Sequence, residues 1–541
     1  MEFNEQQKEV INSEADKIVC IAAAGSGKTV VLLNRIRRLI ENGADPQSML
    51  VLTFTNAAAH EMVERFEKFE LGDTVPTFGT FHAFCYSLIV ECEAVRAALG
   101  YADIPVVAAD DDIRTIRTST RLVCGTKLSD KKLEGPREAL TYKEQFEYDV
   151  YWKQYRKSLL TEGLITFDIM CYDVCKLFTE HRPCIQQYLD RYKYVFCDEF
   201  QDTDTLQMEF IESFNGAKLF VCGDPQQMLY RFRGCTNDII KNLASSPDWT
   251  LIKLPRNYRS TKQIVEFSNK IFAEAWAGSP YYLQGISDSE GAFVKIAGKF
   301  PMSAWSAASI LKDIAMECRE RSAAILCRTN LEVSTISNML KQLNIPYKGK
   351  SSNAEAAGIL RSSLSCENCV AWLSSLLPNK EFAEYIRLLT TEPDISQEPK
   401  FLSVFGDRFE SQLNKIFDCR RALGNQNIPA GLMEVAKILD INVRAEQVSV
   451  FDNIRDGIAF LIDQTGRTAE KGIYVGTIHS VKGLEYDIVH VLGVNGKYFP
   501  VFKDEDQMAC FYVACTRAKT RLTIWCDRTK TEYLQPDGIF D

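Results

Sequence analysis

The sequence predicts an α/β protein that contains two parallel sheets, each interrupted by a mainly helical insertion. Short apolar runs typical of strands alternate with stretches of helical periodicity in two separate blocks of the chain. Each block is broken by a long, charged segment without this alternation. A chain of 541 residues is also too long for one hydrophobic core. The predicted segments are 1–82 with 171–255 for the first domain, 83–170 for its insertion, 256–350 with 472–541 for the second domain, and 351–471 for its insertion.

The composition is that of an ordinary globular protein, with 46% hydrophobic and 25% charged residues. The sequence has no apolar run long enough to span a membrane, and the polar start Met1–Lys8 lacks a signal-peptide core. We therefore expect a cytoplasmic protein with no membrane partner, whose 18 cysteines are reduced and mostly buried. The one C-x-x-C, from Cys366 to Cys369, has no second pair at zinc-binding spacing, so no structural metal is expected.

The formal net charge of −9 excludes few functions. Proteins that bind nucleic acid are often basic, but net charge bears on solubility and steering rather than on fold. Because a local groove can be basic on an acidic body, the charge counts only weakly against a nucleic-acid partner.

A strand, a glycine-rich loop and a helix follow one another near the N-terminus, which is the order that a phosphate-binding loop requires. The apolar run Lys17–Ala22 predicts the strand, and Gly43 stands where the helix should end. Lys28 could reach the β- and γ-phosphates of a triphosphate, and the Thr29 hydroxyl could bind Mg²⁺. A chance glycine-rich turn is the alternative. The predicted helix face is Val30, Leu33, Ile36 and Ile40. The loop is Ala22, Ala23, Ala24, Gly25, Ser26, Gly27, Lys28 and Thr29, with Ala22 in place of the pattern's first glycine.

Two adjacent acids follow a later apolar strand, Tyr194–Cys197. Asp198 could hold the Mg²⁺ shell, and Glu199 could orient and deprotonate an attacking water. The next predicted strand, Lys218–Cys222, leads to Gln227, which could sense a γ-phosphate. Acids after a strand, in a chain that also has a phosphate loop, indicate nucleotide hydrolysis.

Other polar and aromatic residues also follow predicted strands. The segments Thr53–Ala59 and Thr77–His82 place hydroxyls, an amide and aromatics at the strand ends where ligands gather in open α/β sheets. In Tyr230–Arg233 aromatics alternate with arginines, which favours a base-stacking platform over the core packing usual for aromatics. The Gln7 amide can donate and accept, as pairing with adenine requires, although a solvated glutamine on a helix face is an equal alternative.

In chain order, these motifs resemble those of superfamily 1A helicases, the UvrD/Rep/PcrA-like group. The resemblance covers both ends of the chain and continues in Ile473–Glu485 and Tyr512–Ala518. In such helicases two RecA-like parallel-sheet domains sandwich ATP with Mg²⁺, and each domain carries a helical insertion. The resemblance implies the same fold and the same cofactors here.

The resemblance also implies roles for individual residues. Gln7 would contact adenine, Tyr258 would stack on it, and Glu485 would contact the ribose. Arg259 and Arg517 would neutralise charge on the transferring phosphoryl group, as the chemistry of that group demands. The residues that hold phosphates and Mg²⁺ and run hydrolysis would be Lys28, Thr29, Asp198, Glu199 and Gln227. The residues that face DNA would be Phe54, Asn56, Thr80, His82, Tyr230, Phe232 and His479.

The sequence departs from the family pattern at several points. Val30 stands where many relatives have a basic residue near the adenine, and Phe232 replaces the commoner tryptophan. Asp-Pro-Gln at 224–226 replaces a more acidic run. The insertion 351–471 is short and lacks a recognisable duplex-gripping signature, which predicts weak unwinding by the isolated chain. Too few residues follow Arg517 for a fused nuclease domain.

Three functions remain open at this point. The first is an ATP-driven 3′–5′ translocase or helicase on single-stranded DNA and single-strand/duplex junctions. The second is a single-strand-stimulated ATPase that unwinds poorly alone and acts with a separate nuclease, in anti-phage defence or repair. The third is a nucleotide-switched scaffold. The aromatic residues favour the first two, and stimulation of ATPase by single-stranded DNA would separate them from the third.

Overall fold

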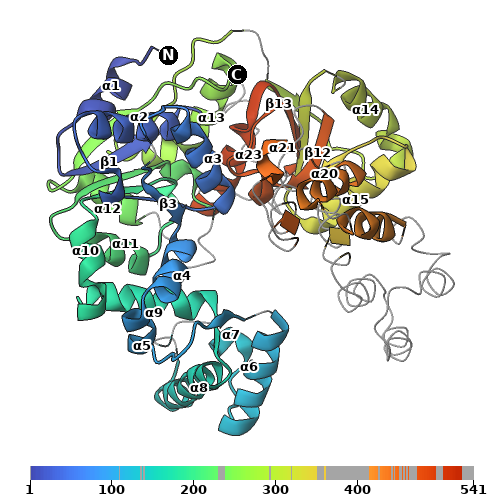
Figure 1. Cartoon of the computed structure of the whole chain (residues 1–541). Helices are drawn as coiled ribbons and strands as arrows, with labels where there is room; N and C mark the ends of the chain where they lie inside the picture. The colour runs from blue at the N-terminus through green and yellow to red at the C-terminus, as the bar shows by residue number, and fades with distance from the viewer. Residues whose placement is uncertain are drawn as a thin grey trace, which may run out of the picture. The chain divides into compact units, whose positions relative to one another are not determined.

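The structure is a computed structural model, and the chain in it divides into two compact units (Figure 1). The first unit is Met1–Asn257 with Gly278–Gly285, and the second is Tyr258–Ala277 with Ile286–Asp541. The residues that the structure describes are 2–72, 74–108, 110–133, 137, 140–229, 238–290, 294–318, 320–349, 359–360, 363, 414–424, 427–439, 441, 443, 445–449, 454, 457–458, 461, 472–494 and 504–526.

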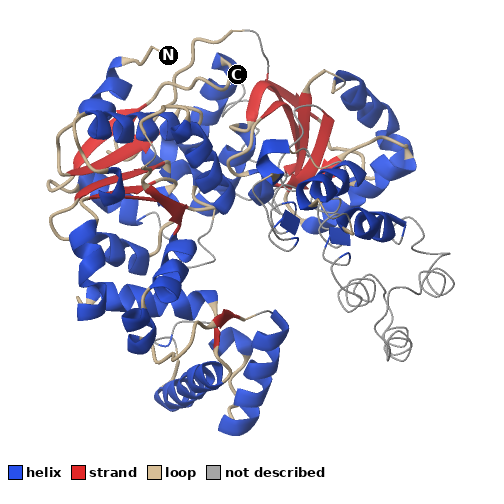
Figure 2. Ribbon diagram, viewed as in Figure 1, coloured by secondary structure: helices blue, strands red, loops and turns tan. Residues whose placement is uncertain are grey.

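The first unit is built on a six-stranded parallel sheet with the strand order β3-β2-β6-β7-β1-β8 (Figure 2). Its strands are β1 (Lys17–Ala22), β2 (Met49–Thr53), β3 (Thr77–Thr80), β6 (Tyr194–Cys197), β7 (Lys218–Gly223) and β8 (Thr250–Leu254). The central strand β1 pairs on both sides, with Cys20 opposite Cys222 of β7 and Ile252 of β8. The strands predicted from apolar runs in this half are confirmed, with ends that differ by at most two residues.

Both faces of this sheet are covered by helices, which explains why its strands read as continuous apolar runs. Side chains alternate along β1, so Val19 and Ile21 enter one core while Ile18 and Cys20 enter the other. The core of Val19 includes α4 (Phe81–Glu91), α9 (Phe167–Thr179), α10 (Gln186–Arg191), α11 (Thr205–Glu212) and α12 (Asp238–Ser245). The core of Ile18 includes α1 (Glu5–Asn12), α2 (Lys28–Glu41) and α3 (Asn56–Glu67).

Helix α2 follows the predicted phosphate loop and ends just before Gly43, whose φ of +93° is the left-handed conformation common after helices. Its buried face is wider than predicted, because both α1 and α3 contact it. Val30 and Ile40 of the predicted face are only half-buried. The buried residues are Val31, Leu32, Leu33, Arg35, Ile36 and Leu39.

A helical lobe is inserted between β3 and β6 (Figure 1). It contains α5 (Glu93–Ala98), α6 (Asp110–Cys124), α7 (Asp130–Leu133), α8 (Tyr142–Thr161), β4 (Val106–Val107) and β5 (Leu164–Ile165). The segment is mainly helical, as predicted, and it also contains β4 and β5, which pair as parallel strands. At two residues each, they are too short to appear as apolar runs. Tyr151 and Tyr155 of α8 join the same core as Val19, so the lobe is packed continuously with the sheet through α4 and α9.

The second unit contains another six-stranded parallel sheet, with the order β11-β12-β10-β13-β14-β9. Its strands are β9 (Val294–Ala297), β10 (Ser322–Cys327), β11 (Lys348–Gly349), β12 (Gly472–Thr477), β13 (Tyr486–Val494) and β14 (Ala518–Cys526). Its helices are α13 (Lys262–Trp276), α14 (Ala304–Glu317), α15 (Asn330–Gln342) and α23 (Glu505–Cys515). This sheet confirms the second block of alternating strands and helices; β12 lies within the motif Ile473–Glu485, and β13 begins directly after that motif.

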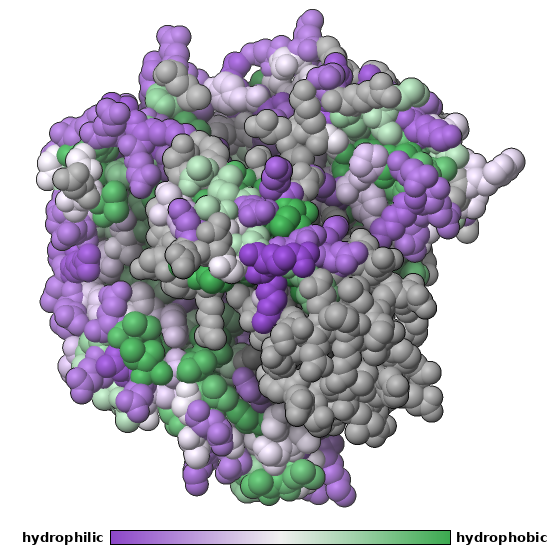
Figure 3. Space-filling view, turned by 45° about the vertical axis from the view of Figure 1, so that its right-hand side comes forward, coloured by the Kyte–Doolittle hydropathy of each residue, from purple (hydrophilic) through white to green (hydrophobic). Residues whose placement is uncertain are grey.

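Parts of the predicted insertion 351–471 are described within the second unit. Helices α20 (Ile428–Ile438) and α21 (Ala445–Val448) share a small core that includes Leu432 and Val448. The C-x-x-C at Cys366 and Cys369 lies outside the described residues. Within the described residues, no helix combines the length and apolar character that crossing a membrane requires. On the face drawn in Figure 3, hydrophilic residues cover much of the described surface and apolar residues form smaller patches among them.

Candidate active site

The predicted phosphate loop joins β1 to α2 in the first unit. Gly25 and Gly27 have φ values of +67° and +81°, left-handed conformations that glycine adopts without a Cβ clash. Helix α2 starts at Lys28, so the loop leads into a helix N-terminus whose N–H groups and dipole favour an anion. The hydroxyl of Ser26 is buried with no hydrogen-bond partner in the described chain. The loop therefore has the backbone form and an unused polar atom that suit a bound phosphate.

Gln7 is buried, so the alternative of a solvated glutamine on a helix face was wrong. Its Nε2 donates to the carbonyl of Ser26 at 3.2 Å, and its Oε1 accepts from the backbone N–H of Asn4 at 3.2 Å. Asn4 caps the start of α1 in return, through a hydrogen bond of 2.8 Å from the Gln7 N–H. The side chain of Gln7 thus links α1 to the phosphate loop.

The acidic pair at the end of β6 lies against the first turn of α2. The hydroxyl of Thr29 donates to Oδ2 of Asp198 at 3.1 Å, and Nζ of Lys28 lies 3.5 Å from Oε1 of Glu199. Glu199 has a φ of +54°, a conformation uncommon for a residue other than glycine, and its N–H donates to Oδ1 of Asp198 at 3.0 Å. Such a backbone persists only where surrounding contacts hold it, and it is frequent in active sites.

These groups shift one another's protonation. Burial raises the pKa of the Asp198 carboxyl, and the charge of Glu199 raises it further, while Lys28 opposes both effects. Burial alone would lower the pKa of Lys28, but Glu199, Asp224 and Asp198 raise it above its ordinary value. Lys28 is therefore a protonated cation at neutral pH, held among three carboxyl groups.

Gln201 connects the ends of two strands, and sequence reading did not assign it a role. Its Nε2 donates to Oε2 of Glu199 at 2.5 Å, and its Oε1 accepts from the N–H of Asp224 at 3.0 Å. The side chain is fully buried, and a Cβ at Gly223 would lie 2.5 Å from its Oε1. Nε2 of Gln227 donates to Asp224 at 2.7 Å. One series of hydrogen bonds therefore runs from Glu199 to Gln227. The only signal for Gln201 in the sequence was its place two residues after Glu199.

The donors at this site fit a magnesium nucleotide. Mg²⁺ takes oxygen ligands and is usually held by one or two carboxylates together with water and substrate phosphates. Thr29 and Asp198 supply a hydroxyl and a carboxylate that already touch. Among the residues that the structure describes, no three His, Cys, Asp or Glu side chains are arranged to hold a metal ion by themselves. A metal at this site would therefore depend on phosphate oxygens for further ligands.

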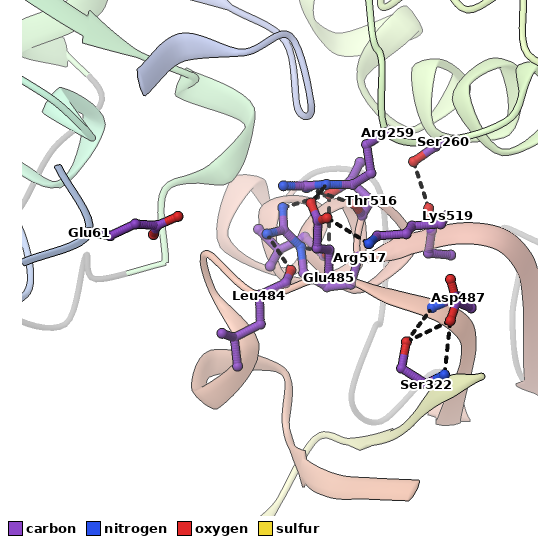
Figure 4. A network of polar contacts seen from close by, with 12 residues as sticks. Glu61, Arg259, Ser260, Ser322, Leu484, Glu485, Asp487, Thr516, Arg517 and Lys519 are labelled. Carbon is purple, nitrogen blue, oxygen red and sulfur yellow. Dashed lines mark hydrogen bonds and ion pairs between the residues drawn. The ribbon is translucent and has the colours of Figure 1, made fainter. Parts of the chain in front are cut away.

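In the second unit, Arg259 and Glu485 form an ion pair with 2.6 Å between Nε and Oε2 (Figure 4). The other carboxylate oxygen lies 2.8 Å from Nζ of Lys519, a residue that sequence reading did not single out. Burial would raise the pKa of Glu485, but Arg259 and Lys519 outweigh burial and lower it. Tyr258, predicted to stack on adenine, is 56% exposed in this unit. The structure thus brings together Arg259, Glu485 and Lys519, which follow β8, β12 and α23 in the chain.

Arg517 is almost fully buried, and its guanidinium bonds within its own unit (Figure 4). Nε donates to the carbonyl of Val513 at 3.0 Å, and one terminal nitrogen donates to the carbonyl of Leu484 at 3.2 Å. The other terminal nitrogen donates to the hydroxyl of Thr516 at 3.1 Å. These bonds join the end of α23 to the loop that carries Glu485, which is a structural use of an arginine predicted to face phosphate.

The residues predicted to face DNA in the first unit follow β2 and β3. Phe54 is half-buried and Asn56 is exposed at the start of α3. The hydroxyl of Thr80 accepts from the N–H of Ala83 at 3.1 Å and caps α4. His82 lies on the first turn of α4 and is exposed.

The other residues predicted to face DNA are further along the chain. His479 lies in the second unit, where burial and then Arg328 and Lys482 lower the pKa of its imidazole. Tyr230 and Phe232 lie outside the described residues. The predicted adenine, phosphate and DNA residues therefore fall into two groups, one in each unit.

A phosphate loop and an acidic pair on a parallel sheet define a P-loop nucleotide hydrolase, and the two sheets are RecA-like. Residues 3–99 and 114–248 match the UvrD/REP helicase N-terminal domain, and residues 252–353 and 384–529 match the UvrD-like helicase C-terminal domain. The chain therefore belongs to the UvrD/REP helicase family, which consists of ATP-hydrolysing DNA helicases.

Relatives that are named as DNA helicases match the chain over most of its length and most of theirs. A probable DNA helicase II homolog of Mycoplasma capricolum is 27% identical, over 96% of this chain and 83% of its own. The ATP-dependent DNA helicase PcrA of Staphylococcus aureus is 25% identical over the same shares. PcrA of Staphylococcus epidermidis is also 25% identical.

Proposed function

We propose that this chain is an ATP-dependent translocase and helicase that moves 3′ to 5′ on single-stranded DNA. The observation that supports hydrolysis most directly is the contact of Lys28 and Thr29 with Glu199 and Asp198 at the phosphate loop. Family membership supplies the DNA substrate, and the relatives named DNA helicase II and PcrA favour the same activity.

In this proposal the first unit holds the triphosphate and its metal. Lys28 binds the β- and γ-phosphates, Thr29 and Asp198 hold Mg²⁺, and Glu199 accepts a proton from the attacking water. Mg²⁺ held by Thr29 and Asp198 would supply positive charge that offsets the charge of the phosphate oxygens. Gln201 acts as a positioning residue that aims the Glu199 carboxylate. Gln227 contacts the γ-phosphate, and its hydrogen bond to Asp224 connects that contact to Gln201 and Glu199.

The second unit would supply the remaining nucleotide contacts. Arg259 would stabilise charge on the transferring phosphoryl group, with its guanidinium oriented by Glu485. Tyr258 would stack on the adenine and Glu485 would also contact the ribose. Arg517 keeps its expected role toward the phosphoryl group, and its buried hydrogen bonds would orient the loop at Glu485. Gln7 would contact the adenine from the first unit.

The DNA path would follow the strand ends of both sheets. Single-stranded DNA is bound by stacking on aromatic side chains and by polar contacts to its backbone. The residues that we propose to contact it are Phe54, Asn56, Thr80, His82, Tyr230, Phe232 and His479. Neither the described residues nor the relatives add support for a separate nuclease partner, so the activity to test is that of the chain alone.

The test is a strand-displacement and ATPase assay on the purified chain. We expect ATPase to rise on addition of single-stranded DNA, and 3′-tailed duplexes to be opened in preference to 5′-tailed ones. Because the predicted insertion 351–471 is short, unwinding should be weak and translocation on single strands robust. ATPase that is indifferent to single-stranded DNA would refute a translocase and favour a nucleotide-switched scaffold. The variant Glu199→Gln serves as the hydrolysis-deficient control.

A further inference from the structure

Arg35 is a buried arginine of the first unit that no step of the proposed mechanism uses. It lies on α2, and only 2% of it is exposed. One of its terminal nitrogens, Nη1, donates to the carbonyl of Val10 at 2.7 Å and to the carbonyl of Ser13 at 2.8 Å. Its guanidinium carbon lies 5.7 Å from the centre of the Phe220 ring on β7. Arg35 therefore attaches the end of α1 to α2, above a strand of the sheet.

The two carbonyls that Arg35 binds belong to the last turn and the cap of α1. This helix ends at Asn12 and is capped by Ser13, and its last turn has no basic residue of its own. The last carbonyls of a helix have no partner within the helix and carry partial negative charge, which a cation stabilises. Burial and the nearby Arg38 lower the pKa of Arg35 to about 10 while Glu14 opposes them, so Arg35 is charged at neutral pH. The missing cation thus comes from the neighbouring helix.

The first turn of α1 is attached to the phosphate loop. Nε2 of Gln7 donates to the carbonyl of Ser26 at 3.2 Å, and a Cβ at Gly27 would lie 3.5 Å from the same nitrogen. Helices α1 and α2 contact each other along this side of the sheet (Figure 1). Helix α1 is therefore held at both ends, by Gln7 at the loop and by Arg35 at the last turn.

Helix α1 is short enough to move as one rigid unit. It has eight residues, and a rise of about 1.5 Å per residue makes it about 12 Å long. A displacement of its last turn relative to α2 would therefore also displace the Gln7 amide relative to the phosphate loop. Lys28 and Thr29 would be affected less, because they belong to α2 itself.

We propose that Arg35 is a positioning residue for base recognition, which holds α1 against α2 so that the Gln7 amide stays where it can pair with adenine. This inference rests on the proposed function, in which Gln7 contacts the adenine. The amide has one hydrogen and one lone pair beyond its bonds to Ser26 and Asn4. These can pair with N7 and with the 6-amino group of adenine. A base with an oxygen at position 6 would oppose two acceptors, so the position of the amide decides how well adenine is preferred.

The experiment compares ATP with inosine triphosphate, whose base carries an oxygen in place of the 6-amino group. The value of kcat/KM is measured for both nucleotides with the full chain, and the ratio of the two values reports base discrimination. We expect this ratio to fall about 2- to 10-fold in Gln7→Ala, the effect of losing one neutral hydrogen bond. Arg35→Met should lower the ratio by a similar factor through a higher KM for ATP. Its kcat at saturating ATP should change little, because the phosphate loop is retained.

Three further measurements separate base recognition from other effects. Arg37→Met is the matched control, because it removes an exposed arginine of α2 that pairs with Glu41 at 2.7 Å, and it should keep the wild-type ratio. Inorganic tripolyphosphate, an inhibitor without a base, should bind Arg35→Met as well as it binds the wild type. The double variant of Gln7→Ala with Arg35→Met should lose no more discrimination than Gln7→Ala alone, since Arg35 acts through Gln7.

Two results would overturn the role of Arg35. If its role is only structural, Arg35→Met will lower the melting temperature and leave the ratio at its wild-type value. If tripolyphosphate binding weakens as much as ATP binding, the effect lies in the phosphate loop rather than at the base. Should Arg35→Met fail to fold, Arg35→Lys decides: lysine keeps the cation but is one atom shorter, so α1 must shift and the ratio should still fall. A wild-type ratio in Arg35→Lys would then overturn the inference.

The variant Gln7→Ala distinguishes this inference from the proposed function. A wild-type ratio in Gln7→Ala would refute the adenine contact of the proposed function, and the role of Arg35 with it. A lowered ratio in Gln7→Ala beside a wild-type ratio in Arg35→Met would refute the role of Arg35 alone.

Discussion

Gln201 and Glu199, two residues apart after β6, are joined by a hydrogen bond of 2.5 Å from the side-chain amide to the carboxylate. The oxygen of the same amide accepts a hydrogen bond from the N–H of Asp224. In a flipped amide the NH₂ group would face that N–H, so two donors would oppose each other. Gly223 is the residue that leaves space for this side chain. The orientation of the Glu199 carboxylate is therefore set by a buried amide that is itself held on both sides.

Replacing Gln201 with leucine should lower kcat for ATP about 10- to 100-fold, since a hydrogen bond to a charged group is worth about 1.5–3 kcal/mol. KM for ATP should change little, because Gln201 does not face the phosphate loop in this proposal. Steady-state ATPase at several pH values checks this. The pH at which activity rises should move upward, because Glu199 loses a donor that favours its ionised form.

Gly223→Ala provides a matched test of the same contact. A methyl group there meets Oε1 of Gln201 at 2.5 Å, so the amide must move and kcat should fall as it does in Gln201→Leu. Gln186→Leu is the control, since it removes an exposed amide–carboxylate hydrogen bond to Asp190 on α10. Wild-type kcat in both Gln201→Leu and Gly223→Ala would mean that Glu199 is oriented without the amide.

Lys28→Ala and Glu199→Gln should fail in different ways. Lys28 is the cation among three carboxyl groups, so its loss should weaken nucleotide binding and abolish turnover. Glu199→Gln should keep nucleotide binding and lose turnover, because an amide cannot take a proton from water. Titration with a fluorescent ATP analogue, beside ATPase, distinguishes the two. Near-normal turnover in Glu199→Gln would place the general base elsewhere.

Arg259→Ala and Arg517→Ala should separate catalysis from stability. Loss of either arginine should lower kcat about 10³-fold or more if it faces the phosphoryl group. Arg517→Ala should lower stability more than Arg259→Ala does, by about 1–3 kcal/mol, because its almost fully buried guanidinium donates to the carbonyls of Val513 and Leu484. A thermal melt beside the ATPase assay reads both effects. If Arg517→Ala melts like the wild type, its buried hydrogen bonds do not hold the loop in solution.

His490 should make the second unit sensitive to acid. Burial, with smaller effects of Arg521 and Lys295, lowers its pKa from 6.5 to about 4, and its Nδ1 accepts from Trp525 at 3.2 Å. The folded state binds a proton at His490 less readily than the unfolded state does. The stabilisation that this pKa difference gives the folded state is therefore complete above pH 6.5 and is lost as pH falls toward 4. The full pKa shift of His490 corresponds to about 3 kcal/mol of unfolding free energy.

Urea unfolding followed by tryptophan fluorescence at pH 7.5, 5.5 and 4.5 measures this loss. His490→Gln serves as the comparison, since glutamine does not titrate in this range. The difference in unfolding free energy between wild type and variant should therefore change with pH in the predicted direction. A difference that stays constant across the three pH values would show that His490 is not the group responsible.

Local patterns were sufficient for the strands around the phosphate loop and for the backbone form of that loop. A parallel strand that is covered on both faces has apolar residues at nearly every position. The apolar runs at β1, β6, β7 and β8 therefore predict buried parallel strands. The order of strand, glycine loop and helix likewise predicts the conformations of Gly25 and Gly27, since these depend on the backbone nearby. The two-residue strands β4 and β5 were not predictable, because such short segments carry no period.

The tertiary structure decided what the buried polar side chains do. In the sequence, Gln7 could have been solvated, Gln201 had no stated role, and Arg517 was assigned to phosphate alone. Their partners are Ser26, Asp224 and Leu484, which are distant in the sequence and are brought near by packing. The sequence by itself determined the form of the loop between β1 and α2, because that form depends on residues next to one another in the chain. Which amide contacts the Glu199 carboxylate follows only from how separate elements pack.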